Sequence, residues 1–302
     1  MYEGLNSPSI HTPQNISEYS QTVLRYPNAR IWAGGTNIMS QEKAYPSRET
    51  NSEIVYLAQI EELKKIARND RMIEIGSTVT LNELLKNNNG VIPSILKENI
   101  IAVGSPLITD RATIGGSIAA RDNITTIPGT LITLGATAEL RYIRKKTVKS
   151  KWIPLSQMLN ESKDGRISLP ERGLITRIRV SLANYDYSYF KEVGNYVDNP
   201  EETVAVAFTA TANEGTLTTP HFAVTFPTQG IVYSKDLDNI FMQLHFPLSS
   251  NEFNQLKSIT YTFIDSVTPN ITRLQRARLN SILEELINQI NARVLVDSSS
   301  LS

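Results

Sequence analysis

The chain has 302 residues, its 30 Lys and Arg balance 30 Asp and Glu, and it contains no Cys. Zero net charge argues against partners held by excess positive charge, such as nucleic acids or anionic membranes. Without Cys, the chain itself has no disulfide, no thiol nucleophile and no Cys-ligated zinc or iron–sulfur site. Any redox chemistry therefore needs a bound organic cofactor or the metals of a partner.

The first residues do not suggest a secretory signal. Residues 1–12 lack the basic and apolar segments of a secretory signal. No window reaches the roughly 18 continuous apolar residues of a membrane span. We therefore expect a cytoplasmic protein without a membrane anchor, in which the polar residues 297–302 form a frayed tail.

The first half of the sequence is typical of short strands separated by helices. Thr12 and Pro13 predict a helix start, with Thr12 as the N-cap. Apolar spacing predicts a short helix over 60–66. Thr80 and Glu83 form a T-x-x-E capping box that opens another helix. Apolar runs or alternation predict strands at 30–33, 54–57, 72–76 and 138–142.

The second half has a different pattern. Residues 203–211 and 221–226 alternate on either side of Glu214 and Gly215, which predicts an antiparallel hairpin. Apolar residues at helical spacing over 271–290 predict one long amphipathic helix that packs on the sheet of this half. A dimer seam is the alternative interpretation of that helix.

Two glycine pairs each follow a strand-like segment, one within A-G-G-T-N at 33–37 and one within T-I-G-G-S at 113–117. Glycine permits positive φ and close approach of the backbone to a ligand, so successive free amides there can bind a diphosphate. Neither loop fits the P-loop or the G-x-G-x-x-G pattern of nicotinamide-binding folds. A tight turn without a ligand is the alternative for each pair.

Further motifs follow in a fixed order, in the segments 56–66, 73–84, 103–108, 111–116 and 131–136. This series resembles the FAD-binding subunit of the molybdenum hydroxylases, the family of the flavin subunits of xanthine dehydrogenase and aerobic carbon-monoxide dehydrogenase. The resemblance covers about 12–180 and continues more weakly to the C-terminal helix. It implies an α+β fold. The FAD-binding domain would span 1–172, in subdomains of roughly 1–55 and 56–172, and a smaller α+β domain with an antiparallel sheet and a long helix would span 173–296.

The resemblance also implies which residues bind FAD. One wall of the diphosphate site would be Ala33, Gly34, Gly35, Thr36 and Asn37, and the neighbouring Trp32 and Ile38 would also belong to the cofactor site. The other wall would be Thr113, Gly115 and Gly116, with the Ser117 hydroxyl as a supplementary donor. Residues beside the flavin would be Val103, Gly104, Ser105, Ile175 and Lys191. Trp32 either packs in the core, which we favour, or stacks on the adenine; Lys191 either lies near the flavin or is a solvated lysine.

The sequence departs from the family pattern at several positions. Asn37 stands where the first loop usually has Asp. The segment 120–126 lacks the usual N-x-S-P-x-x-D, and Thr126 falls at the position of its cofactor-binding Asp. Arg121 and Asp122 are candidate substitutes for that Asp.

The function implied is a flavoprotein subunit with noncovalent FAD. Electrons would come from an iron–sulfur small subunit, fed by a molybdenum-cofactor large subunit, and would pass to NAD⁺ or another acceptor. One alternative is a non-catalytic structural subunit that has lost FAD. A minor alternative is an enzyme like the enolpyruvyl-UDP-N-acetylglucosamine reductases, which share the fold. No residue is predicted to be catalytic or to bind a metal, and His11, His221 and His245 are expected to be structural.

Overall fold

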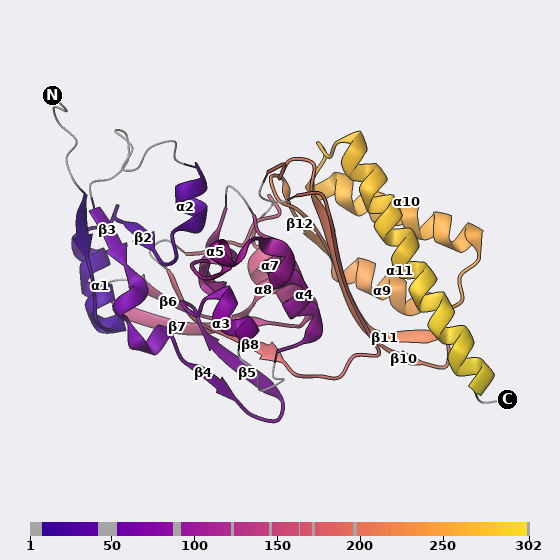
Figure 1. The fold of residues 1–302 in the computed structure, drawn as a ribbon, viewed down its shortest axis with the longest axis horizontal. Coiled ribbons are helices and arrows are strands. Elements are labelled where there is room, and N and C mark those ends of the chain that lie inside the picture. Colours follow the sequence, from indigo (N-terminus) through magenta and orange to yellow (C-terminus); the bar gives the residue numbers. More distant parts are fainter. Residues whose placement is uncertain are drawn as a thin grey trace.

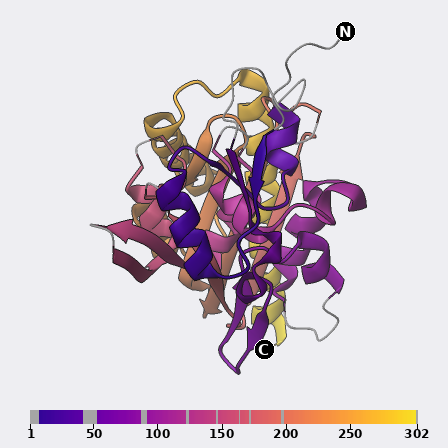
Figure 2. The same cartoon turned by 90° about the vertical axis from the view of Figure 1, so that its left-hand side faces the viewer.

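A computed structural model describes residues 8–41, 53–86, 92–121, 124–144, 147–162, 164–170, 173–195 and 198–300. Three sheets with their helices follow one another along the long axis of the molecule (Figure 1). In the view from the N-terminal end, the first sheet and its helix lie in front and the C-terminal helices lie behind (Figure 2). The α+β class expected from the sequence is confirmed.

The first layer is a small parallel sheet in the order β1-β3-β2, formed by β1 (Ser9–His11), β2 (Arg30–Trp32) and β3 (Glu53–Tyr56). Helix α1 (Ile16–Arg25) packs on it through buried Ile16, Tyr19 and Val23. The predicted N-cap at Thr12 is wrong. Asn15 caps the helix, because its side chain accepts a hydrogen bond from the Glu18 amide at 2.9 Å.

The second layer is an antiparallel sheet in the order β4-β5-β8-β6-β7. Its strands are β4 (Ile66–Arg68), β5 (Met72–Gly76), β6 (Thr137–Arg144), β7 (Thr147–Pro154) and β8 (Leu174–Ser181). Short helices contribute apolar side chains to the core of this layer: α3 (Leu81–Lys86), α4 (Ser94–Val103), α5 (Pro106–Thr109), α6 (Ile114–Ala119), α7 (Ile127–Thr133) and α8 (Leu155–Asn160). The α5 side chain that packs against this core, Ile108, is only partly buried.

Strand β8 lies in the middle of this sheet, between β5 and β6. The predicted C-terminal domain starts at residue 173, so β8 would belong to that domain. Because its pairing partners are both strands of the first half, we propose a domain boundary after β8.

The predicted helix over 60–66 is wrong. The segment forms two 3₁₀ turns, Leu57–Gln59 and Glu61–Leu63, and Ile66 begins β4. The carbonyls of Leu63 and Lys65 accept hydrogen bonds from Thr78 and Gly76, so they are not available to a continuing helix.

The third layer is an antiparallel sheet in the order β12-β11-β10-β9. Its strands are β9 (Tyr187–Val193), β10 (Val204–Asn213), β11 (Thr216–Phe226) and β12 (Gly230–Tyr233). Strands β10 and β11 are the predicted hairpin. The helices that follow are α9 (Lys235–Gln243), α10 (Ser250–Val267) and α11 (Arg273–Ser300).

Both faces of this third sheet are covered. Phe208 and Phe222 face α9, where their rings contact Phe241. Ala207 and Ala223 face the opposite way and belong to the apolar core of the first half. Helices α4 and α7 of the first half pack on that second face.

Helix α11 confirms the predicted long helix and its packing on the sheet (Figure 1). Its buried apolar residues belong to the core of this half: Leu279, Ile282, Leu283, Leu286, Ile287 and Ile290. The apolar face that suggested a dimer seam is therefore buried within this chain. The backbone stays helical to Ser300, beyond residue 297 where we expected a tail to begin.

Candidate functional site

The first glycine loop connects β2 to α2 (Thr36–Gln41). Gly35 has φ +76°, which glycine adopts without steric cost. Gly34 is required for a different reason, because a Cβ there would overlap the backbone carbonyl oxygen of Arg111. The first loop therefore lies directly against the segment that leads into the second glycine motif.

The backbone amides of Gly34, Gly35 and Thr36 donate no hydrogen bond to another described residue. Three successive amides in a turn with one positive φ form a concave donor set that suits a diphosphate. Trp32 is half-buried, not in the core, and its indole packs against Gly35.

The second glycine loop has a different structure from the one expected. Thr113 caps α6, and its hydroxyl accepts from the Gly116 amide at 3.1 Å. Gly115 donates to the Ser77 carbonyl at 2.9 Å, and a Cβ on Gly115 would come within 2.7 Å of that oxygen. The expected row of free amides is absent here, because the four amides from Ile114 to Ser117 all donate within the chain.

Thr126, at the position of the family's Asp, lies in the interior between α4 and α7. Its hydroxyl donates to the Asn99 side chain at 2.6 Å, and the Asn99 amide donates to the Thr126 carbonyl at 3.0 Å. Both side chains are buried. Of the candidate substitutes, Arg121 lies 3.5 Å from Asp164, and Asp122 lies outside the described residues.

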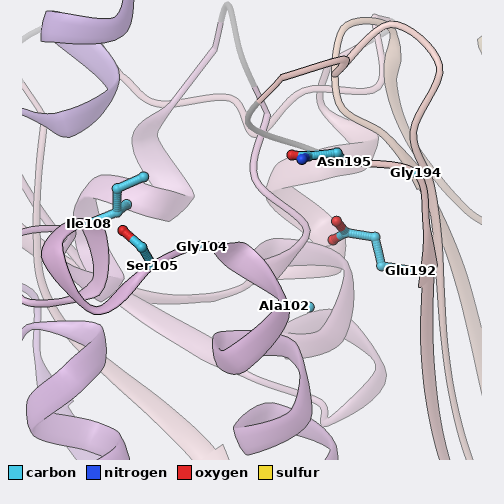
Figure 3. A pocket seen from close by; sticks show the side chains of 7 residues that line it. All are labelled: Ala102, Gly104, Ser105, Ile108, Glu192, Gly194 and Asn195. Carbon is cyan, nitrogen blue, oxygen red and sulfur yellow. The ribbon is translucent and has the colours of Figure 1, made fainter.

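A cavity of about 390 Å³ separates the α4–α5 loop from the end of β9 (Figure 3). The loop side contributes Ala102, Gly104, Ser105 and Ile108. The strand side contributes Glu192, Gly194 and Asn195. Gly104 and Ser105 were predicted to lie beside the flavin, whereas Glu192 was not predicted as a site residue. The alternating pattern of β9 was the signal that could have indicated it.

Three other residues predicted to lie beside the flavin do not line this cavity. Val103 is buried at the end of α4, and Ile175 is buried in the core on β8. The Lys191 ammonium lies 3.3 Å from the Glu285 carboxylate of α11.

Helix α5 joins the cavity to the first glycine loop. Ile108 lines the cavity, its carbonyl accepts from the Arg111 amide at 3.0 Å, and Arg111 lies against Gly34. The cavity and the first glycine loop are thus connected through Ile108 and Arg111.

Two of the three His are held in local contacts. His11 Nε2 lies 2.6 Å from Glu53 and its ring stacks on Tyr26, while His221 Nδ1 lies 3.0 Å from Asp238. Among the described residues no cluster of three His, Asp or Glu could bind a metal ion. In the same part of the chain, every helix is too short or too polar to cross a lipid bilayer.

Residues 5–182 match the family described as "FAD binding domain in molybdopterin dehydrogenase". A chain of CO dehydrogenase from Oligotropha carboxidovorans is 18% identical, with a TM-score of 0.76, over 97% of this chain and 100% of that chain. A chain of quinoline 2-oxidoreductase from Pseudomonas putida 86 is 19% identical, with a TM-score of 0.71, over 95% and 98%. Both show the same fold.

A curated relative is the probable aldehyde oxidase 3 of Oryza sativa subsp. japonica, 25% identical over 107 residues. The match covers 34% of this chain and 8% of the relative, so this chain corresponds to a small part of that protein.

Proposed function

Because the chain belongs to the family of FAD-binding domains in molybdopterin dehydrogenases, we propose that it is an electron-transferring flavoprotein subunit. It takes electrons from the iron–sulfur clusters of one partner and delivers them to NAD⁺ or another acceptor. When bound, FAD supplies both one-electron and two-electron chemistry, and the protein supplies binding, orientation and electrostatics.

The observation that carries this proposal is the set of free amides at the first glycine loop. Backbone donors without partners are costly unless a ligand or water accepts from them. A diphosphate offers the acceptors that Gly34, Gly35 and Thr36 require. This fit supports an FAD diphosphate bound at the first loop, with the second loop acting as its structural support.

Arg111, which was not among the predicted site residues, is a further candidate to bind the diphosphate. Its backbone lies against Gly34 and its side chain is exposed. A guanidinium at this position can form charge-assisted hydrogen bonds to phosphate oxygens. Its place directly before T-I-G-G was the available signal.

The partners proposed are an iron–sulfur small subunit and a molybdenum-cofactor large subunit. Since this chain has no Cys, the clusters of the proposed route belong to the small subunit. Purification of the chain from its native host, followed by identification of the copurifying subunits and their metals, tests this part of the proposal.

A second candidate function is a structural subunit that has lost FAD. It is favoured by Thr126, whose hydroxyl is committed to Asn99 and so does not replace the family's Asp at a cofactor. Titration of the purified chain with FAD separates the two candidates. We expect stoichiometric uptake and a visible flavin absorbance band, whereas a colourless chain that takes up no added FAD would establish the structural role.

A further inference from the structure

The cavity between the α4–α5 loop and β9 has a distinct charge. Its volume of about 390 Å³ is within the range of roughly 300–1,000 Å³ that is typical of ligand sites. Among the described residues that line it, Glu192 is the only charged one. Its carboxylate points from β9 toward the α4–α5 loop (Figure 3).

The alternation of β9 determines which charge enters the cavity. Glu192 pairs with Ala205 of β10, and Lys191 pairs with Val206, so the two side chains leave the strand on opposite faces. Val206 belongs to the core beneath α11, and on that face the Lys191 ammonium meets Glu285. The cavity therefore receives a carboxylate, while the neighbouring ammonium is held on the far side of the sheet.

The polar groups of the cavity match the pyrimidine edge of a flavin. That edge presents an N–H between two carbonyl oxygens. A carboxylate such as that of Glu192 can accept from an N–H, and the Ser105 hydroxyl can donate to a carbonyl. Because α5 connects this cavity to the diphosphate-binding amides, a dinucleotide bound there can place one ring system in the cavity.

We propose that Glu192 lowers the reduction potential of the bound FAD. This inference rests on the proposed FAD binding. Two-electron reduction at neutral pH adds negative charge to the ring system, and an adjacent carboxylate disfavours that charge. A lower potential makes the reduced flavin a stronger reductant, as transfer to a low-potential acceptor such as NAD⁺ requires.

The test is the midpoint potential of FAD bound to the full chain, measured by equilibration with a reference dye. In Glu192→Gln, we expect the ratio of reduced to oxidised FAD at a fixed dye potential to rise about tenfold, which is a shift of ~30 mV for a two-electron couple. Lys191→Gln should shift the potential less. Glu284→Gln, which removes an exposed carboxylate of α11, is the matched control and should not shift it.

The outcomes separate this inference from the proposed function. If Glu192→Gln binds FAD at the wild-type potential, or if Lys191→Gln shifts the potential more, the role of Glu192 is refuted and FAD binding stands. If the wild-type chain binds no FAD, both are refuted. Should Glu192→Gln fail to fold, Asn195→Lys serves instead, because it adds a positive charge at an exposed lining position. An unchanged potential in that variant also refutes the inference.

Discussion

Each glycine of the first loop is needed for its own physical reason. Gly35 provides a positive φ, and Gly34 provides the space for contact with the Arg111 carbonyl. The two requirements can be tested separately, because one concerns backbone conformation and the other concerns packing.

Gly34→Ala should weaken FAD binding by at least about tenfold, because the added methyl group pushes the loop away from Arg111 at a cost of ~1–3 kcal/mol. FAD titration and urea unfolding measure the two effects. Gly135→Ala is the control, since Gly135 has φ +64° with nothing near its Cβ position. It should lose ~1–2 kcal/mol of stability through backbone strain alone and keep its FAD affinity. Wild-type affinity in Gly34→Ala would contradict the role of this contact.

Arg111→Ala should lower FAD affinity about tenfold through loss of a charge-assisted contact to the diphosphate. The loss should be smaller at high ionic strength, because salt screens an exposed charge. Titration at two salt concentrations checks this expectation, with Arg111→Lys as the charge-conserving comparison. An equal affinity of all three proteins at low salt would exclude Arg111 from the site.

At the scale of elements, the second sheet is held together by an ionic ladder on one face. Arg177 of β8 contacts both Glu74 of β5 and Glu139 of β6. Arg179 contacts Glu74 at 2.8 Å, and its guanidinium lies 3.7 Å from the ring centre of Trp152 on β7. The ladder thus joins four neighbouring strands.

Glu139 makes this ladder pH-sensitive. Burial acts to raise the pKa of Glu139, but hydrogen bonds from Arg177, Thr176 and Ser150 outweigh it and lower the pKa from 4.5 to about 2. Ionised Glu139 therefore stabilises the fold above about pH 4.5, and this contribution is lost as the pH falls toward 2. The difference in unfolding free energy between wild type and Glu139→Gln should shrink by about 2–3 kcal/mol over that range. Urea unfolding at several pH values measures it, and a pH-independent difference would contradict it.

The elements predicted correctly are those with local signals. The capping box at Thr80 and Glu83 forms as expected, with hydrogen bonds of 2.7 and 3.1 Å. Helix α10 was not predicted, because its fully buried residues are only Leu256, Thr260 and Ile264, which make a weak apolar pattern. The contact of Gly34 with Arg111 was also beyond a local pattern, because residues far apart in sequence form it.

At the scale of the whole molecule, the third sheet links the two halves. Its faces are buried against α4 and α7 on one side and against α9 and α11 on the other. Residues of both halves line the cavity, so we expect the two halves to unfold in a single transition that also releases FAD.

Leu283→Ala should lower the unfolding free energy by ~2–5 kcal/mol, since Leu283 of α11 is fully buried in the core of the C-terminal half. On heating, FAD should be released at the same lowered temperature at which the helical structure is lost. Leu274→Ala is the matched control on the same helix, because Leu274 is 42% exposed, and it should change stability by less than ~0.5 kcal/mol. Release of FAD well below the unfolding temperature would show that the halves separate independently.

The packing of Gly34 and Gly115 has a consequence for evolution. Each is enclosed by the backbone of another segment, at Arg111 and at Ser77. Purifying selection on folding alone would preserve both glycines in a lineage that had discarded its flavin. Conservation of Gly34 and Gly115 among descendants would therefore reflect packing of the fold, whereas substitution of the exposed Arg111 would indicate loss of the cofactor.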